Sequence, residues 1–573
     1  MYKLREIGTA LAVLSSLGLL SYANHSYAAP QDDIMQRQQQ VLQQQQQDFA
    51  SKRAQAEMQQ RVSQSMAKTQ QQGARLEVFS LPEEEKSFEI SNFYLKADKY
   101  AGKFEWIDKY LDNYNGQKIG VKGINMLMQA INGEIMNRGY VTTRVYVEEQ
   151  DLSTGNFFFT LLPGTISDIR FREETWGTWH NAVAMKRGSL LNIRDIEQTV
   201  DNFNSVPGQN ADIKIEPGPQ EGQSDLVIDI KRDKPYKLFL SVDNSGTEDT
   251  GKAQMSGGLQ LSNPLSINDI FYVNWNEDAT QSGETKGTRA NSIYYSVPVG
   301  KERFTFSHSR QEYKQTVEYA VNPFKSEGEY TQTSLTWTHL LSRGQTYKTD
   351  FELGLVHKTR HSYIDGTEIG VQRQKTTAMQ LGFNHRQYLG PSVLDASLKW
   401  QKGLPWFADA GPTDGMPGEA TTQYNMYLGT LNFITPVPFG ENYDAQYNVS
   451  IRAQKSDQRI YGSEFFSIGG WYSVRGFDGE QTLSAEDGII VRNELRFPIE
   501  NLPHQIYFAI DYGKVHGPST EYLLGTELVG GAIGVRGQYK NFSYDAFVGW
   551  PIKKPDGFTC DSRTYGFMIT AEI

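Results

Sequence analysis

The stretch HQIYFAIDYGKV, residues 504–515, alternates between two kinds of side chain. Ile506, Phe508 and Ile510 are large and apolar, whereas the residues between them are polar, small or acidic, Asp511 among them. Side chains alternate across a β-strand, so this segment would present one oily face and one polar face. Such a strand suits the wall of a transmembrane barrel, with its oily face toward lipid and Asp511 toward the lumen.

Similar alternation recurs through the whole region 236–573. Segments such as YKLFLSV, SIYYSVPV and the final TYGFMITAEI are separated by turns rich in Gly, Asn, Asp and Ser. At roughly 20 residues per strand with its loop, this length would give about 16 antiparallel strands. The chain contains 31 Tyr and 29 Phe, which is typical of the aromatic girdles of such barrels. We therefore predict a transmembrane β-barrel over residues 236–573.

The start of the chain predicts export. Lys3 and Arg5 precede an apolar run around residues 10–20, and small residues surround a cleavage point after Ala28. This is the pattern of a secretory signal peptide, residues 1–28. No later stretch has eighteen apolar residues in a row, so the sequence predicts no transmembrane helix.

Composition and motif spacing exclude several classes of protein. The single cysteine, Cys560, rules out an internal disulfide, and the net charge of −11 argues against nucleic acid as a partner. Ser, His and Asp residues are scattered without the spacing of a catalytic triad, a metal site or a cofactor site. We expect a protein that is not an enzyme and that needs no metal or cofactor.

A glutamine-rich stretch follows the signal peptide. Within residues 29–54, acidic residues near the start (Asp32) and basic residues near the end (Arg53) suit the dipole of a helix. Too few residues are apolar for that helix to lie in an oily core. One reading is a disordered low-complexity linker. The reading we adopt is a polar plug helix inside a water-filled lumen, followed by a linker over residues 55–74.

Between the glutamine-rich stretch and the barrel, strand and helix signals repeat. We predict two modules of β-α-α-β-β order, residues 75–163 and 164–235, each about 75 residues long. In the first, the expected strands are FEISNFYL (88–95), YVTTRVYV (140–147) and NFFFTLL (156–162), and the expected helices are FEWIDKYLDNY (104–114) and GINMLMQAINGEIMNRG (123–139). In the second, the strands are TISDIRF (165–171), ADIKI (211–215) and SDLVIDI (224–230), with a helical region ending in IRDIEQTVDNF (193–203).

One arginine stands apart from its neighbours. In SIGGWYSVRGFDGE, residues 467–480, Arg475 lies among glycines and apolar side chains. A guanidinium cannot lose its proton in a protein, so a shielded Arg475 requires a carboxylate partner. Asp511 is one candidate. Alternation in GIIVRNELRF (488–497) points Glu494 toward the lumen as well, which makes it a second candidate.

Nine stretches carry a family resemblance: GYVTTRVYVEEQDLSTG (139–155), NSVPGQNADIKIEPG (204–218), DNSG (243–246), SNPLSIND (262–269), YYSVPVG (294–300), KGLPWF (402–407), IGGWYSVRGF (468–477), IDYG (510–513) and LVGGAIGVRG (528–537). Together they resemble the TpsB transporters of two-partner secretion, relatives of the haemolysin activator, filamentous-haemagglutinin and contact-dependent-inhibition (CdiB) secretion proteins. The resemblance covers nearly the whole mature chain. It implies an N-terminal plug helix, two periplasmic POTRA domains and a sixteen-stranded barrel in the bacterial outer membrane.

The resemblance also implies how the VRGF motif, Val474, Arg475, Gly476 and Phe477, is used. It places this motif at the tip of a long extracellular loop that folds back into the barrel, where Arg475 would meet Asp511. One departure lies two residues before Asp511, where the family usually has Phe or Gly and this chain has Ala509.

The function implied is transport of an unfolded TpsA-type exoprotein, recognised through its N-terminal secretion domain. Cargo would dock on the first module by β-augmentation. The expected groove combines the helix bearing Met126, Met128 and Ile131 with the strand of Tyr140, Val141, Thr142, Thr143 and Arg144. We expect a monomer that contacts outer-membrane lipid and, during biogenesis, the barrel-assembly machinery.

Two other functions compete with protein secretion. An outer-membrane assembly and insertion factor would share the architecture, but the plug helix would be unexplained. An outer-membrane enzyme such as a lipase would need a nucleophile motif, which the sequence does not show. The cargo could be a contact-dependent growth inhibition toxin, an adhesin or a haemolysin, and the resemblance to CdiB proteins favours the toxin.

Overall fold

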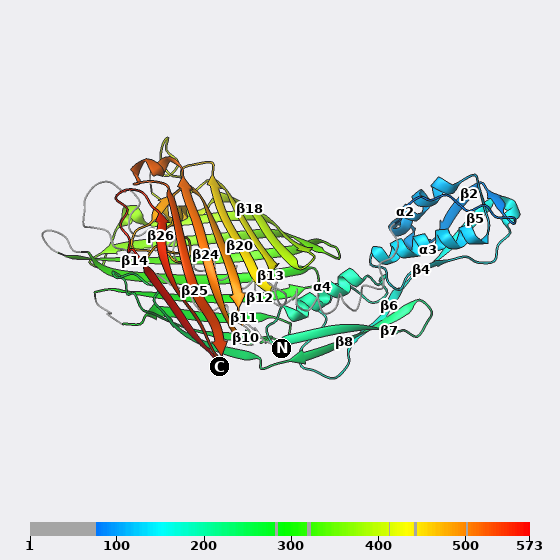
Figure 1. The fold of residues 1–573 in the computed structure, drawn as a ribbon, viewed down its shortest axis with the longest axis horizontal. Coiled ribbons are helices and arrows are strands. Elements are labelled where there is room, and N and C mark those ends of the chain that lie inside the picture. The colour runs from blue at the N-terminus through cyan, green and yellow to red at the C-terminus, as the bar shows by residue number, and fades with distance from the viewer. Residues whose placement is uncertain (1–75, 281–284, 318–322, 412, 440–443, 500–501) are drawn as a thin grey trace.

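In the computed structural model, two small α/β modules extend from one end of a β-barrel (Figure 1). The signal peptide, plug helix and linker predicted for residues 1–74 lie outside the described residues. The structure describes residues 76–573 except 281–284, 318–322, 412, 440–443 and 500–501.

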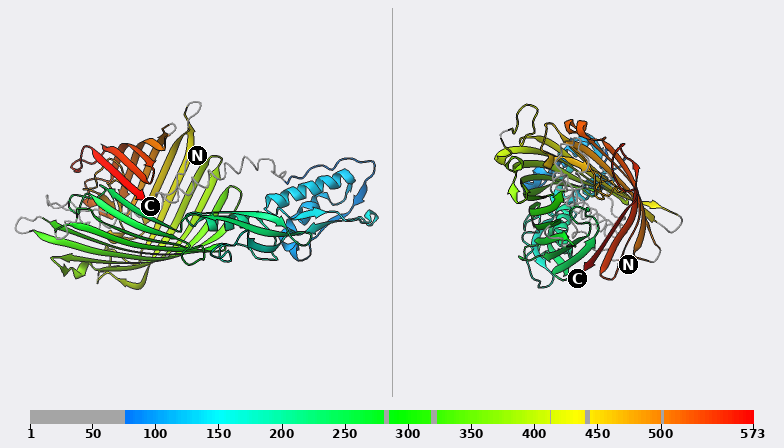
Figure 2. Two further views of the ribbon diagram at one scale, coloured as in Figure 1. Left: turned by 90° about the horizontal axis from the view of Figure 1, so that it is seen from below. Right: turned by 90° about the vertical axis from the view of Figure 1, so that its left-hand side faces the viewer.

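The barrel is closed and antiparallel, and Figures 1 and 2 show it from three sides. Its described residues form sixteen wall strands, which confirms the predicted fold, while the short β16 (Thr367–Glu368) pairs with the end of β15. The wall strands are β9 (Tyr236–Asp243), β10 (Gln254–Ser262), β11 (Ile270–Asp278), β12 (Gly287–Val299), β13 (Glu302–Val317), β14 (Phe324–Arg343), β15 (Tyr347–Ile364), β17 (Gln374–Leu389), β18 (Ser392–Asp409), β19 (Asn425–Pro438), β20 (Asp444–Ser456), β23 (Asp487–Pro498), β24 (His504–His516), β25 (Glu527–Tyr539), β26 (Phe542–Lys553) and β27 (Thr564–Glu572).

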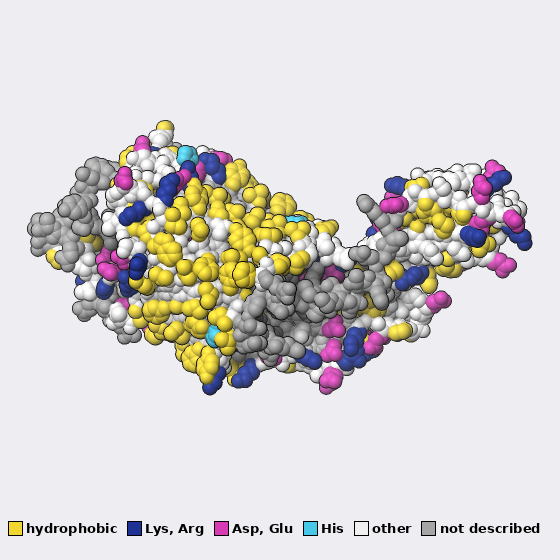
Figure 3. All heavy atoms as spheres, viewed as in Figure 1, with side chains coloured by type: hydrophobic (Ala, Val, Ile, Leu, Met, Phe, Trp, Pro, Cys, Tyr) yellow, Lys and Arg dark blue, Asp and Glu magenta, His cyan; other side chains and the backbone are white. Residues whose placement is uncertain are grey.

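Alternation along β24 determines which side chains face outward. Ile506, Phe508 and Ile510 are 40–59% exposed, whereas Tyr507 and Asp511 are at most 1% exposed. Hydrophobic side chains cover the outer face of the barrel in Figure 3, and charged side chains gather at its ends and on the modules. The predicted lipid-facing and lumen-facing sets of β24 are therefore confirmed.

The first and last strands close the barrel. Met568 of β27 lies opposite Asp243 of β9, and the pairing continues to Glu572 opposite Phe239. Beyond the ladder, Ile573 and Leu238 exchange backbone hydrogen bonds of 2.9 and 3.1 Å. Closure leaves no strand edge in lipid, where an unpaired backbone group would be costly.

The first module has a three-stranded sheet of order β2-β5-β4. The predicted strand 140–147 is wrong in its first half, because residues 140–143 form a turn toward the second module. There the hydroxyl of Thr143 accepts a hydrogen bond from the backbone N–H of Gly164 at 3.0 Å. The elements are β1 (Phe88–Ile90), β2 (Asn92–Lys96), α2 (Ala101–Leu111), β3 (Gln117–Ile119), α3 (Val121–Asn137), β4 (Arg144–Tyr146) and β5 (Asn156–Leu162).

The second module has one α-helix where two were predicted. Its sheet has the order β6-β8-β7, formed by β6 (Thr165–Phe171), β7 (Gln209–Pro217) and β8 (Gln223–Arg232), with α4 (Ile193–Asn204) packed on it. Residues 172–192 are turns and irregular backbone. The first predicted helix is absent because this segment reaches the barrel instead: the N–H of Thr178 donates to the carbonyl of Ser266 at 2.9 Å.

The second module is tied to turns at the nearer end of the barrel. Arg343, the last residue of β14, is almost fully buried between barrel and module. Its guanidinium binds Asp201 at 2.5 Å and Glu197 at 3.2 Å, both on α4. A further ion pair joins Lys301 to Asp195 of α4 at 2.7 Å. These contacts place α4 directly against the strand ends (Figure 1).

Candidate functional site

The site lies inside the barrel, on the long loop of residues 457–486 that joins β20 to β23. Two short strands, β21 (Phe466–Ile468) and β22 (Leu483–Ala485), pair into a hairpin whose tip carries the VRGF motif. The loop starts at the end of the barrel opposite the modules and folds back against the inner wall. Val474, Arg475 and Phe477 are at most 3% exposed, so this tip is fully packed.

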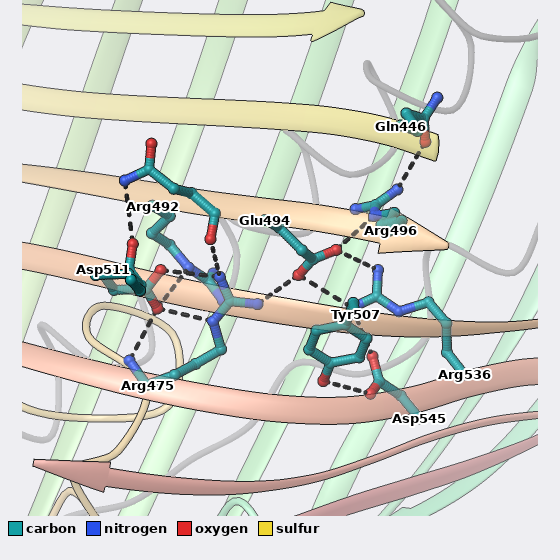
Figure 4. Close-up of polar contacts among 11 residues, drawn as sticks. Gln446, Arg475, Arg492, Glu494, Arg496, Tyr507, Asp511, Arg536 and Asp545 are labelled. Carbon is teal, nitrogen blue, oxygen red and sulfur yellow. Dashed lines mark hydrogen bonds and ion pairs between the residues drawn. The ribbon is translucent and has the colours of Figure 1, made fainter. Parts of the chain in front are cut away.

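Asp511 of β24 holds Arg475 through both of its carboxylate oxygens (Figure 4). Oδ2 accepts from Nε of Arg475 at 2.7 Å, and Oδ1 accepts from Nη2 at 2.8 Å. The backbone N–H of Arg475 also donates to Oδ2 at 3.0 Å. A bidentate fork with a third, backbone donor fixes both the side chain and the main chain of the loop tip.

Glu494 of β23 is a second carboxylate on the same guanidinium. It binds Nη1 of Arg475, Nε of Arg496 and, at 3.0 Å, Nη1 of Arg536. Arg536 binds Asp545 of β26 in turn, at 3.1 Å. The structure thus brings the predicted residues Arg475, Asp511 and Glu494 together, within a larger network of charges on the lumen wall.

Tyr507 lies between two of these cations. Its ring has the guanidinium of Arg536 over it at 4.3 Å and that of Arg475 at 5.8 Å. Its hydroxyl donates to Asp545 at 2.8 Å. A cation near an aromatic face is stabilised further where water is excluded. The network is therefore held by ring contacts as well as by ion pairs.

Glycines on the inner wall make room for the backbone of the tip. A Cβ on Gly549 would lie 2.8 Å from the backbone nitrogen of Gly476, and one on Gly513 would lie 2.8 Å from a methyl of Val474. Gly476 itself has φ +102°, and a Cβ there would meet the carbonyl oxygen of Trp550 at 2.3 Å. The third motif position therefore accepts glycine alone.

Apolar side chains surround the charged centre. Val474 and Phe477 belong to a buried cluster that includes Ile468, and Phe477 packs edge-on against Phe558 at 5.8 Å between centroids. Trp471 packs on a second cluster that contains Ala509. The family departure at Ala509 thus lies where the tip rests on the wall. Apolar surroundings exclude water and strengthen the ion pairs of Arg475.

Alternation along residues 488–497 found Glu494 and also points Arg496 inward, but sequence reasoning missed Arg536, the other cation that shares Glu494. Arg536 lies in the stretch LVGGAIGVRG, which contributed only to the resemblance. Alternation along β25 could have pointed its side chain inward, yet the pairing of strands was not known.

Among the described residues no group of three or more His, Cys, Asp or Glu side chains could hold a metal ion. Nor, in that part of the chain, is any helix long and apolar enough to cross a membrane.

The predicted docking residues of the first module divide between surface and interior. Ile131 and Thr143 are fully buried, and Met128 and Tyr140 pack against the same core. Val141 packs against the core of the second module, and Thr142 is half-buried beside Gly164. Met126 and Arg144 are exposed. The eight residues therefore do not line one groove.

Side chains cap both edges of the sheet in the first module. Asn132 of α3 bonds the N–H and the carbonyl of Val145 on β4, at 2.7 and 2.9 Å. On β2, the N–H of Leu95 donates to Asp108 at 2.9 Å, and the N–H of Phe93 donates to the side-chain oxygen of Asn115 at 2.9 Å. A peptide that added a strand here would first have to displace these caps.

Comparison with known proteins places this architecture in a family. The profile described as haemolysin secretion/activation protein ShlB/FhaC/HecB matches residues 222–537. A ShlB-type POTRA profile matches residues 88–164, and a second POTRA profile matches residues 165–217. The two modules are therefore POTRA domains, which are periplasmic in this family.

Individual relatives agree over most of the length. The chain is 35% identical over 552 residues to outer membrane transporter CdiB-2 of Burkholderia pseudomallei strain 1026b, which covers 91% of this chain and 94% of the relative. It is 29% identical to outer membrane transporter CdiB of Dickeya dadantii strain 3937, over 80% of this chain and 81% of that one. The solved structure of CdiB from Escherichia coli superposes with a TM-score of 0.81 at 25% identity, covering 95% and 99% of the two chains. The protein is thus an outer-membrane transporter that belongs to the ShlB/FhaC/HecB family of TpsB proteins.

Proposed function

We propose that this chain recognises an unfolded TpsA-type exoprotein by its N-terminal secretion domain in the periplasm and passes it through the barrel to the cell surface. The transporter acts as a monomer in outer-membrane lipid, where the barrel-assembly machinery inserts it. The sequence carries no phosphate-binding loop, so folding of the cargo outside the cell would drive the movement.

One observation carries the proposal: a loop occupies the lumen, and polar groups fix it to the wall. Arg475 is bound by two carboxylates on neighbouring strands and by no covalent bond. Ion pairs and hydrogen bonds can exchange for water or for the polar backbone of a passing chain. A loop held in this way can close the channel and still be displaced.

The second POTRA domain offers a fixed path from the periplasm to the lumen. Its helix α4 lies on the barrel turns through the buried Arg343. The first POTRA domain, which carries the exposed Met126, lies further from the barrel (Figure 1), where cargo would arrive. The cargo class we favour is a contact-dependent growth inhibition toxin, because the chain is 35% and 29% identical to relatives named CdiB-2 and CdiB.

The test is to sequence the adjacent gene, delete the gene of this chain, and follow any large exoprotein that the neighbour encodes. We expect this exoprotein to be absent from the cell surface, as measured by protease accessibility on intact cells, and restored by the chain in trans. Unchanged surface exposure would contradict the proposal. A loss of many unrelated outer-membrane barrels would instead identify an assembly and insertion factor. Growth inhibition of neighbouring cells tests the toxin assignment separately.

A further inference from the structure

A second buried ion pair fixes the same loop to a different part of the wall. Glu464 ends the short 3-10 helix Gly462–Glu464, on the arm of the loop that leaves β20. Both of its carboxylate oxygens accept from Nζ of Lys358 on β15, at 2.8 and 2.7 Å. The two side chains are 5% and 13% exposed, so this pair is shielded from water.

Lys358 reaches the loop from the lumen face of β15. Its neighbours at alternate positions, Val356 and Arg360, are buried, whereas Leu355 points outward and is 42% exposed. In the order of the described strands, β15 lies six positions from β24, through β17, β18, β19, β20 and β23. The pair therefore joins the loop to a region of the wall far from Asp511.

Hydrogen bonds hold the same arm beside the ion pair. The hydroxyl of Ser463 donates to the side-chain carbonyl of Gln374, the first residue of β17, at 3.0 Å. The amide of Gln454 on β20 donates to the backbone carbonyl of Glu464 at 2.7 Å. Phe465 packs against a cluster that contains the buried Tyr424. The arm is as closely fixed as the tip.

We propose that Glu464–Lys358 is a second anchor, which holds the outgoing arm of the loop in the closed channel independently of Arg475. This inference rests on the proposed function, in which the loop must move for cargo to pass. Releasing the tip alone would leave the arm attached to β15. Opening would then require both ion pairs to break, and Lys358 would be a positioning residue for the closed state.

Breaking one member of a buried pair leaves the other as an uncompensated charge, which favours states in which that charge meets water. Lys358→Met and Glu464→Gln should each shift the arm toward a released state. The expected change is a rise of roughly tenfold in the open fraction. The tip should remain seated, because Asp511 and Glu494 still hold Arg475.

A second ion pair of β15, made by Glu352, offers a matched control. Lys399 of β18 binds Glu352 of β15 at 2.5 Å, across the intervening strand β17. This pair joins wall to wall and does not contact the loop. Lys399→Met should therefore leave the loop unchanged.

Hydrogen exchange of the purified full chain, read by mass spectrometry, tests the proposal directly. In Lys358→Met and Glu464→Gln we expect about tenfold faster exchange over residues 459–466, with residues 473–477 as protected as in the unaltered chain. The swapped double variant, Lys358→Glu with Glu464→Lys, should restore protection. In single-channel recordings in planar bilayers, Lys358→Met and Glu464→Gln should open more often than the unaltered chain, and the swapped double variant should open less often than either.

Three outcomes would overturn the second anchor. They are unchanged exchange over residues 459–466, equal loss of protection at the tip and the arm, and a swapped variant no better than the single ones. The swapped variant also keeps the test decisive if a single variant fails to fold. Neither measurement uses cargo, so a chain that secretes no exoprotein would refute the proposed function and leave this result standing.

Discussion

The carbonyl oxygen of Arg475 lies 1.8 Å from the position that a Cβ on Gly530 would occupy. Gly530 is also the cross-strand partner of Asp511 in the pairing of β24 with β25. The two strands thus supply a carboxylate and an adjacent open space at the same level of the wall. The loop tip fits there because one position binds its side chain and the next accepts its backbone.

Gly530→Ala should therefore displace the tip without unfolding the barrel. Gly530 does not have the left-handed backbone that favours glycine, so the added methyl acts through its clash with the loop tip, chiefly with Arg475 and also with a methyl of Val474 at 3.3 Å. We expect higher conductance in planar bilayers and reduced secretion. Gly429→Ala on β19, where a Cβ would meet nothing within 4 Å, is the matched control. Normal channels in Gly530→Ala would show that the tip can shift without consequence.

Removing the charge of Arg475 or of Asp511 should release the same tip. Loss of one partner of a buried pair costs about 3–5 kcal/mol, because the remaining charge is left unpaired. Arg475→Lys should be a poor substitute, since a single ammonium cannot reproduce the two-pronged contact. The barrel should still assemble, as judged by heat-modifiable migration on gels, because its backbone ladder is unchanged.

A double-mutant cycle separates the two acceptors. Asp511 takes two guanidinium nitrogens and a backbone N–H of Arg475, with Arg492 further away at 3.6 Å, whereas Glu494 also binds Arg496 and Arg536. Arg475→Ala with Asp511→Asn should be little worse than either change in secretion. Independent, multiplying losses would make Glu494 the principal partner. Lys514→Ala, which breaks an exposed pair on the same strand, should have almost no effect.

Alternation along single strands was predictable, and strand pairing was not. The lipid-facing set of β24 follows directly from period two, and the bounds of β5 and β6 match the expected 156–162 and 165–171. The meeting of Arg536 with Glu494 depends on register across several strands. Register is set by hairpin lengths and by packing across the whole wall, which local patterns do not encode.

In the first POTRA domain, the helix was predictable but its buried face was misread. Met126, Met128, Ile131 and Ile135 have roughly helical spacing, yet only Ile131 and Ile135 belong to the buried face of α3. The face that enters the core consists of Gly123, Leu127, Ile131 and Ile135, each four residues from the next. The helix is apolar on more than one side, so composition alone could not distinguish the core face.

The difference between exposed and buried residues of α3 gives a prediction for cargo docking. Met126→Glu should lower secretion while leaving the thermal unfolding of the POTRA region unchanged, because its side chain is exposed. Ile131→Glu should unfold the first POTRA domain, because it buries a charge without a partner. Circular dichroism during heating distinguishes the two. Unaltered cargo binding in folded Met126→Glu would place the docking surface elsewhere.

The predicted plug can be tested without knowing its position. Deleting residues 31–54 should raise single-channel conductance, since a polar helix in the lumen would obstruct ions. A segment of equal length in which several residues are replaced by proline is the control, because proline prevents the helix. Unchanged conductance after deletion would favour the alternative reading, a disordered linker.

The last prediction concerns the junction between the second POTRA domain and the barrel. Arg343→Met would remove the buried cation that Glu197 and Asp201 of α4 share, leaving Glu197 with Arg194 at 2.7 Å and Asp201 with Lys348 at 3.8 Å. We expect α4 to separate from the barrel turns, so that a protease cuts residues 172–192 more quickly while the barrel stays intact. Arg310→Met removes an exposed pairing with Glu312 and Glu329 on the wall and should leave cleavage unchanged. If cleavage is equally slow in both variants, then the hydrogen bonds of Asn202 to Gly300 and of Thr178 to Ser266 suffice to hold the domain. Any secretion defect of Arg343→Met would then come from the lost charge at the barrel entrance and not from separation of the domain.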